Sequence, residues 1–243
     1  MKRFRYWKEI GDFAIISCLS LKFMKYCFIF IALYNFSYTF DFKSSIILYS
    51  KSSKWCFGGN LSLSEKRSIF WYELAGMILI IILGSMLHFT FELSGNQPIV
   101  GVFSAVNESV WEHLKIAFWP TILYAIFEYR YLKKRTNNFF FAKTIGIYAI
   151  MIIIPVIFYT YTIFIEHNLT IDVLSFILAI ILGQLVSFKL LTFKKLSKNL
   201  KLISIVALVI LGLAFVVFTF YPPQVQLFQD PNTGDYGIIN HLH

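Results

Sequence analysis

Charged residues are scarce in this sequence of 243 residues. Asp, Glu, Lys and Arg together make up 14% of the chain, whereas 58% of the residues are apolar. A soluble domain carries about 25% charged residues, because its surface must be hydrated. This chain has too few charges to cover a globular surface, so most of that surface must face an apolar medium. The lipid bilayer is the simplest such partner.

Sequence signatures of known chemistry are also missing. Three cysteines occur, Cys18, Cys27 and Cys56, but they form no CxxC pair, so neither a zinc finger nor a disulfide framework is indicated. There is no HExxH, no GxSxG and no Walker-type loop. The stretch DPNTGDYG superficially resembles a calcium loop, but it lacks the glycine and the distant glutamate of an EF-hand, and we interpret it as a turn.

Basic residues are in excess, with a net charge of +9, but they are clustered. Lys and Arg are absent from residues 68–114, 144–188 and 202–243. This distribution is typical of the positive-inside rule for membrane proteins and not of a phosphate-binding face. It excludes nucleic acid as the expected partner.

Five apolar segments are long enough to cross a bilayer as helices. They cover about residues 69–91, 114–132, 144–165, 171–191 and 202–221. The second is called a span partly from its context, because its strictly apolar part is short. The predicted fold is an all-α polytopic membrane bundle of about five transmembrane helices, forming a domain over residues 65–223. Residues 224–243 form a polar tail.

With five spans, the basic clusters all fall on one side of the membrane. That side is predicted to be cytoplasmic. The protein is then a multi-pass protein of the cell membrane, with the N-terminus of the helical domain inside and the C-terminus outside.

Residues 1–64 do not fit this pattern, because Lys22 and Lys25 interrupt their apolar stretches. We interpret them as an N-terminal extension that is not part of the native protein, with translation starting at Leu61 or Leu63. The alternative is a basic segment on the cytoplasmic membrane surface, held by anionic lipid.

Polar residues gather at the expected outer face. His88 and Glu92 are four residues apart and share one helix face, and Asn107, Glu108, Glu112 and His113 begin the second span. Ionisable residues at membrane depth are expensive and indicate a functional site. In the alternative interpretation, His88 bonds within the bundle, Glu92 is solvated, and Ser104 or Asn107 caps the second helix beside Glu108.

The two polar groups are joined by a short loop, so we expect His88 and Glu92 to lie within reach of residues 108–113. A divalent metal is the cofactor that these side chains suggest, with His88, Glu92, Glu112 and His113 as candidate ligands. Glu112 and His113 project from different stripes of their helix, so one metal can use both only at the boundary between the stripes.

Small residues recur at four-residue steps in the fourth span, at Ser175, Ala179, Gly183 and Ser187. Such a stripe allows close approach of a neighbouring backbone, and we predict a helix-packing face.

Four segments resemble a family of small bacterial and archaeal membrane proteins known only as a domain of unknown function. They are HFTFELSG (residues 88–95), VGVFSAVNESVWEHLKIAFWP (100–120), GQLVSFKLL (183–191) and PPQVQLFQDPNTGDYGI (222–238). The resemblance covers about three quarters of the chain, beginning after the extension. It implies a membrane protein but supplies no activity and no residue roles.

Three hypotheses for function remain. The favoured one is a membrane enzyme whose outer site uses His88, Glu92, Asn107, Glu108, Glu112 and His113. A transporter or channel would instead line a polar path with His113, Thr121, Tyr124 and Glu128. A structural or interaction protein would dock a partner, not identified by the sequence, on the outer loop and tail.

Overall fold

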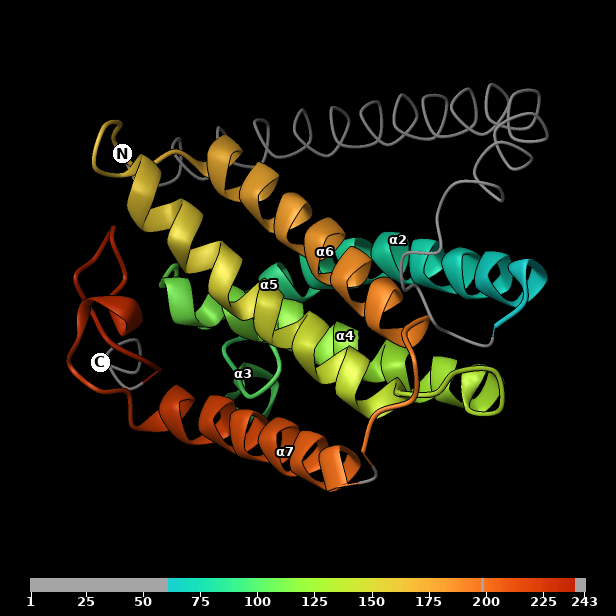
Figure 1. Cartoon of the computed structure of the whole chain (residues 1–243). Coiled ribbons are helices and arrows are strands. Elements are labelled where there is room, and N and C mark those ends of the chain that lie inside the picture. The colour runs from blue at the N-terminus through green and yellow to red at the C-terminus, as the bar shows by residue number, and fades with distance from the viewer. Residues whose placement is uncertain (1–60, 198, 239–243) are drawn as a thin grey trace. The chain divides into compact units, whose positions relative to one another are not determined.

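The computed structural model of the chain describes residues 61–197 and 199–238, which are mainly helical (Figure 1). The elements are α2 (Leu63–Leu93), α3 (Pro98–Gly101), α4 (Val110–Leu132), α5 (Phe139–Tyr161), α6 (Leu169–Leu191), α7 (Asn199–Phe220) and the short 3₁₀ helix η1 (Gln226–Phe228). These residues contain no β-strand, only an isolated bridge between Gln229 and Tyr236. The predicted all-helical bundle is confirmed. The expectation for the extension concerns mainly residues 1–60, which lie outside the described residues.

Capping side chains define where the helices begin. At α2, Ser62 and Glu65 form a capping box: the Ser62 hydroxyl accepts from the Glu65 N–H at 3.3 Å, and the Ser62 N–H donates to the Glu65 carboxylate at 2.8 Å. The N-cap of α4 is Ser109, whose hydroxyl accepts from the Glu112 N–H at 3.4 Å. The expectation that Ser104 or Asn107 caps this helix is wrong, because both side chains are used in the preceding loop.

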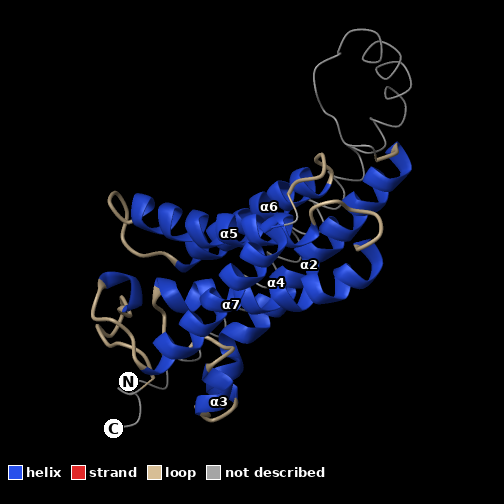
Figure 2. Ribbon diagram, turned by 60° about the horizontal axis from the view of Figure 1, so that its bottom comes forward, coloured by secondary structure: helices blue, strands red, loops and turns tan. Residues whose placement is uncertain are grey.

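Helix α4 occupies the centre of the bundle. It packs against α2, α5, α7 and η1, while α6 packs against α5 and α2 (Figure 2). The polar side chains buried along α4 include Glu112, Lys115 and Glu128. A central position surrounded by other helices allows a helix to carry charge, provided that each charge finds a partner.

Within the part of the chain that the structure describes, four helices are long and apolar enough to cross a membrane: α2, α5, α6 and α7. The sequence predicted five such helices. Helix α4 forms where the second was expected, but its ionisable residues lower its hydropathy below that of a membrane span.

The small-residue face of α6 packs as predicted. Ser175, Ala179, Gly183 and Ser187 are all buried. A Cβ on Gly183 would lie 2.8 Å from the backbone oxygen of Gly146 in α5, and a Cβ on Gly146 would lie 2.8 Å from the backbone oxygen of Gly183. Because no side chain fits there, the two helices approach each other closely at this pair of glycines.

Candidate functional site

Three side chains converge where the C-terminal end of α2 meets the N-terminal end of α4, the end of the bundle that the sequence predicts to face outward. The Nε2 atom of His88 lies 3.3 Å from the Nε2 atom of His113. One carboxylate oxygen of Glu108 lies 3.5 Å from the His88 Nε2 atom and 3.6 Å from the His113 Nε2 atom. We call His88, Glu108 and His113 the outer triad. Its histidines are 18% exposed and its carboxylate is 37% exposed, so the group is reachable from outside.

The loop between α2 and α4 holds Glu108 against the two histidines. The Ser104 hydroxyl accepts from the Phe91 N–H at 3.0 Å and donates to the Leu87 carbonyl oxygen, which ties the loop to the end of α2 beside His88. The C-terminal segment adds a second anchor, because the Glu108 N–H donates to the Asp230 carboxylate at 3.2 Å. Segments far apart in the sequence thus position one carboxylate.

The hydrogen bonding of His113 determines which of its nitrogens is free. Its Nδ1 atom lies 2.9 Å from the carbonyl oxygen of Ser109. A carbonyl oxygen can only accept, so Nδ1 carries the hydrogen, and in the neutral ring Nε2 presents its lone pair to the outer triad. A backbone contact of this kind orients metal-binding histidines in many proteins.

The neighbouring histidines set the charge of Glu108. Burial alone would raise the pKa of its carboxyl. The hydrogen bond from His88 and the charges of His113, His88 and His167 outweigh burial, so that the pKa falls from 4.5 to about 2. The carboxyl is therefore ionised at neutral pH, in the form that binds a cation.

The structure divides the six predicted site residues into two groups. It brings together His88, Glu108 and His113 and leaves out Glu92, Asn107 and Glu112. Glu92 is exposed. The Asn107 side chain accepts from the Ser109 N–H at 2.9 Å and shapes the turn before α4. The ligand set predicted from the sequence contained Glu92 and Glu112 but not Glu108, whereas the donor atoms that cluster belong to His88, Glu108 and His113.

Glu112 is turned away from the outer triad into a buried ion pair. Its carboxylate lies 2.5 Å from the Lys115 ammonium and accepts from the Val106 N–H at 2.9 Å. Lys115 also donates to the carbonyl oxygen of Gly101 at 2.6 Å and to the Thr219 hydroxyl at 2.9 Å. These bonds join α4 to the outer loop and to α7. The stripe argument from helix geometry correctly separates Glu112 from His113.

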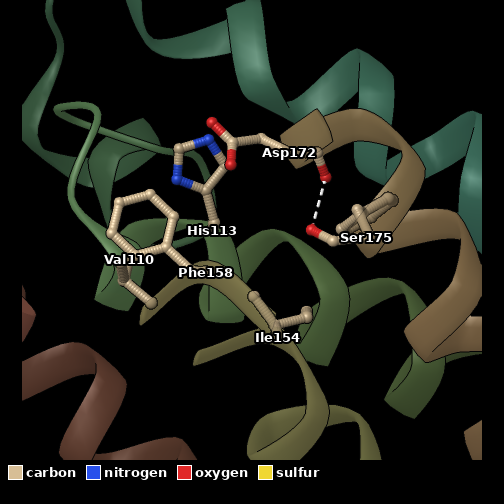
Figure 3. A pocket seen from close by; sticks show the side chains of 7 residues that line it. Val110, His113, Ile154, Phe158, Asp172 and Ser175 are labelled. Atoms are coloured by element: carbon tan, nitrogen blue, oxygen red, sulfur yellow. Dashed lines mark hydrogen bonds between the residues drawn. The ribbon is translucent and has the colours of Figure 1, made fainter. Parts of the chain in front are cut away.

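A small cavity adjoins the outer triad. It has a volume of about 20 Å³, room for about one water molecule. Its polar lining is His113, Asp172 and Ser175, and its other walls are apolar. Figure 3 shows the Ser175 hydroxyl directed at the backbone carbonyl of Asp172, the donor–acceptor distance being 2.8 Å.

Asp172 belongs to a polar group that sequence analysis missed. Its carboxylate lies 2.7 Å from the His167 Nε2 atom and accepts from the Tyr161 hydroxyl at 2.6 Å. His167 is near enough to contribute to the lowered pKa of Glu108. A His and an Asp in and beside the loop between α5 and α6 could have indicated this pair. Because both residues are far from His88 in the sequence, their proximity to the outer triad could not be predicted.

The polar stripe of α4 that suggested a transport path is bonded internally. Thr121 donates to the Ala117 carbonyl oxygen at 2.7 Å, and the Tyr124 hydroxyl donates to the Tyr72 carbonyl oxygen. Glu128 pairs with Lys143 of α5, which also pairs with Glu73 of α2 at 2.8 Å. Sequence analysis overlooked Glu73, although a lone carboxylate inside an apolar run is itself a signal.

The separations within the outer triad suit a small divalent ion. In tetrahedral zinc sites with bonds of about 2.0–2.1 Å, neighbouring ligand atoms lie about 3.3–3.4 Å apart. Octahedral Mg²⁺ at about 2.1 Å would bring adjacent ligands to about 3.0 Å. The observed values of 3.3, 3.5 and 3.6 Å are closer to the tetrahedral case. Two imidazoles and one carboxylate form a donor set that Zn²⁺ binds, and they leave a fourth position open.

The fold and the site together define an all-helical bundle with four candidate membrane-spanning helices and a His–Glu–His cluster. Residues 62–238 match a family described as a family of unknown function, DUF6512, and the chain belongs to that family. Comparisons with curated proteins and with solved structures gave no match.

Proposed function

We propose that this protein is a multi-pass membrane metalloenzyme that binds Zn²⁺ or a similar divalent ion at its outer face through His88, Glu108 and His113. The observation that carries the proposal is the outer triad, in which three donor atoms lie 3.3–3.6 Å apart. Three protein ligands and an open fourth position are typical of catalytic zinc sites, whereas structural sites use four.

The arrangement of α4 supports five spans. His88 lies 15 residues after Glu73, and Glu128 lies 15 residues after His113. The two helices pair antiparallel, with His88 beside His113 at one end and Glu73 sharing Lys143 with Glu128 at the other. This spacing corresponds to roughly 22 Å of helix, so α4 follows α2 across most of a bilayer core.

The chemistry proposed for the site is hydrolysis. A divalent ion held by His88, Glu108 and His113 would supply Lewis-acid chemistry that activates water for attack at neutral pH. The small cavity beside His113 offers room for about one water molecule, and Asp172, which pairs with His167, also lines this cavity. Because the site is proposed at the membrane surface, its substrate would be an amphiphilic ester or a similar molecule with its polar group at that surface.

Metal analysis of the purified full-length protein tests the binding step. We expect about one zinc ion per chain, and we expect H88A, H113A and E108Q each to weaken zinc affinity by at least about tenfold. E92Q is the matched control, because Glu92 is exposed and lies one turn beyond His88; it should bind zinc normally. Folded wild-type protein that retains no zinc, or triad variants that bind as well as E92Q, would refute the proposed site.

The catalytic step needs a separate measurement. Hydrolysis of a p-nitrophenyl ester of a fatty acid, carried in detergent micelles, should depend on Zn²⁺ and should be lost in H113A. If the protein binds zinc through the triad but hydrolyses no ester faster than its triad variants, the metal is not used in this way.

A further inference from the structure

A second group of buried charges lies at the opposite end of the bundle. Glu73 of α2, Glu128 of α4 and Lys143 of α5 meet about one helical turn inside the ends of α4 and α5. Their side chains are 1%, 0% and 3% exposed. We call these three residues the inner charged layer. Its composition is unbalanced, because two carboxyl groups face one ammonium group.

The hydrogen bonds of this layer leave several oxygens without a donor. One oxygen of Glu73 accepts from Lys143 at 2.8 Å and from the Ser187 hydroxyl at 2.9 Å. Its other oxygen has no hydrogen-bond partner among the described residues, and neither oxygen of Glu128 has one, although Glu128 makes an ion contact with Lys143. Buried polar atoms normally have hydrogen-bond partners. The lack of donors to these three carboxylate oxygens therefore points to a hydrogen carried by one of the carboxyl groups.

The neighbouring side chains do not supply a second positive charge. From α6 the layer is faced by Ser187, with Gln184 one turn away, and both are uncharged. The Tyr124 hydroxyl of α4 is bonded to the Tyr72 carbonyl oxygen. Within residues 61–197 and 199–238, the ion pairs of Glu73 and Glu128 are made with Lys143 alone. The fully ionised layer would therefore hold one uncompensated negative charge away from water.

An uncompensated buried charge costs several kcal/mol, and binding a proton removes that cost. We propose that the inner charged layer is an intramembrane proton-binding site, in which Glu73 and Glu128 hold one proton between them while Lys143 stays charged. The proton resides mainly on Glu128, because Glu73 receives both Lys143 and Ser187 and is better stabilised as an anion. The proton comes from water at the adjacent ends of α4 and α5 and adds to a carboxylate oxygen.

This site is independent of the outer triad, and infrared spectroscopy of the full chain in detergent at neutral pH tests it. The wild type should show the C=O stretch of one protonated carboxyl group. Both E128Q and E73Q should lose that band, because each variant leaves one carboxylate paired with one ammonium group. E92Q should keep it, since Glu92 is exposed. A wild type without the band, or a band that survives in either variant, would overturn the proposal.

Thermal unfolding gives a second readout if E73Q does not fold. E128Q removes the excess acid and should unfold within a few degrees of the wild type. K143Q leaves two buried carboxyl groups without a cation and should be strongly destabilised. If E128Q lowers the unfolding temperature as much as K143Q does, Glu128 is needed as a charged partner of Lys143 and does not hold the proton, which overturns the proposal.

Discussion

The charge state of Glu108 depends on burial and on the histidines beside it. The histidines of the outer triad, together with His167, lower its pKa to about 2 from 4.5. A carboxyl group with a lowered pKa in the folded state stabilises that state above its unfolded pKa, and this contribution disappears as the pH falls toward the folded pKa. In the metal-free protein the loss should take place between about pH 4.5 and pH 2.

The pH dependence of unfolding tests this expectation. Metal-free wild type should lose about 1 kcal/mol more stability than E108Q over that acidic range, the figure being reduced for solvent screening at a partly exposed site. Unfolding temperatures measured by fluorescence across the range would give the comparison. Parallel curves for the two proteins would mean that Glu108 is not held as a carboxylate by the histidines.

Among the helices, α5 and α6 pack in close contact through Gly146 and Gly183. A methyl group added to Gly183 would lie 2.3 Å from a side-chain carbon of Ile150 and 2.8 Å from the backbone oxygen of Gly146. The backbone cannot give way as a flexible side chain can, so the helices must separate. The stripe of small residues in α6 therefore has a structural role in this contact.

The substitution Gly183→Ala should destabilise the protein by roughly 1–3 kcal/mol through overpacking. Gly212→Ala in α7 is the matched control, because a Cβ at that position lies 3.5 Å from its nearest neighbour, Phe118, which is an ordinary contact. That variant should be neutral or slightly stabilising, since Ala favours helix more than Gly does. Thermal unfolding in detergent distinguishes them, and equal stability of the two variants would contradict the packing argument.

At the largest scale, the helical bundle of the described residues is organised around α4, which carries its ionisable residues among apolar helices. One end of α4 contributes His113 to the outer triad, and the other contributes Glu128 to the inner charged layer. The C-terminal segment closes over the outer end, where Trp111 of α4 packs between Phe215 and Phe228 at ring-centroid distances of 4.6 and 4.7 Å. The same segment places Asp230 against Glu108.

The proposed topology follows from this arrangement, together with the positive-inside rule. Reporters fused after Lys134 or after Lys198 should be found in the cytoplasm, and a reporter fused at the C-terminus should be found outside. Five spans place a tag fused just before α2 and the C-terminal reporter on opposite sides of the membrane. If α4 does not cross, the spans are α2, α5, α6 and α7, and these two reporters will lie on the same side. Reporter activity in intact cells and in lysed cells measures the outcome directly.

Sequence alone determined the helical elements and part of the site. Apolar length predicted α2, α5, α6 and α7, because a bilayer-spanning segment must satisfy its backbone hydrogen bonds internally, and sequence context was also needed to predict α4. The four-residue spacing of small residues predicted the packing face of α6. The concentration of His and Glu placed the outer triad among six candidate residues, but Glu108 was not among the predicted metal ligands. These features depend on residues close together in the sequence, so composition and the helical period are enough to recognise them.

Only the tertiary structure decided which polar side chains meet. It selected Glu108 over Glu92 and Glu112, because the outer loop and Asp230 orient Glu108 while Lys115 binds Glu112. It joined Glu73, Glu128 and Lys143 from three helices and brought His167 near the outer triad. Such encounters depend on how helices rotate and pack against one another, and side-chain partners distant in sequence leave no periodic signal in a single chain.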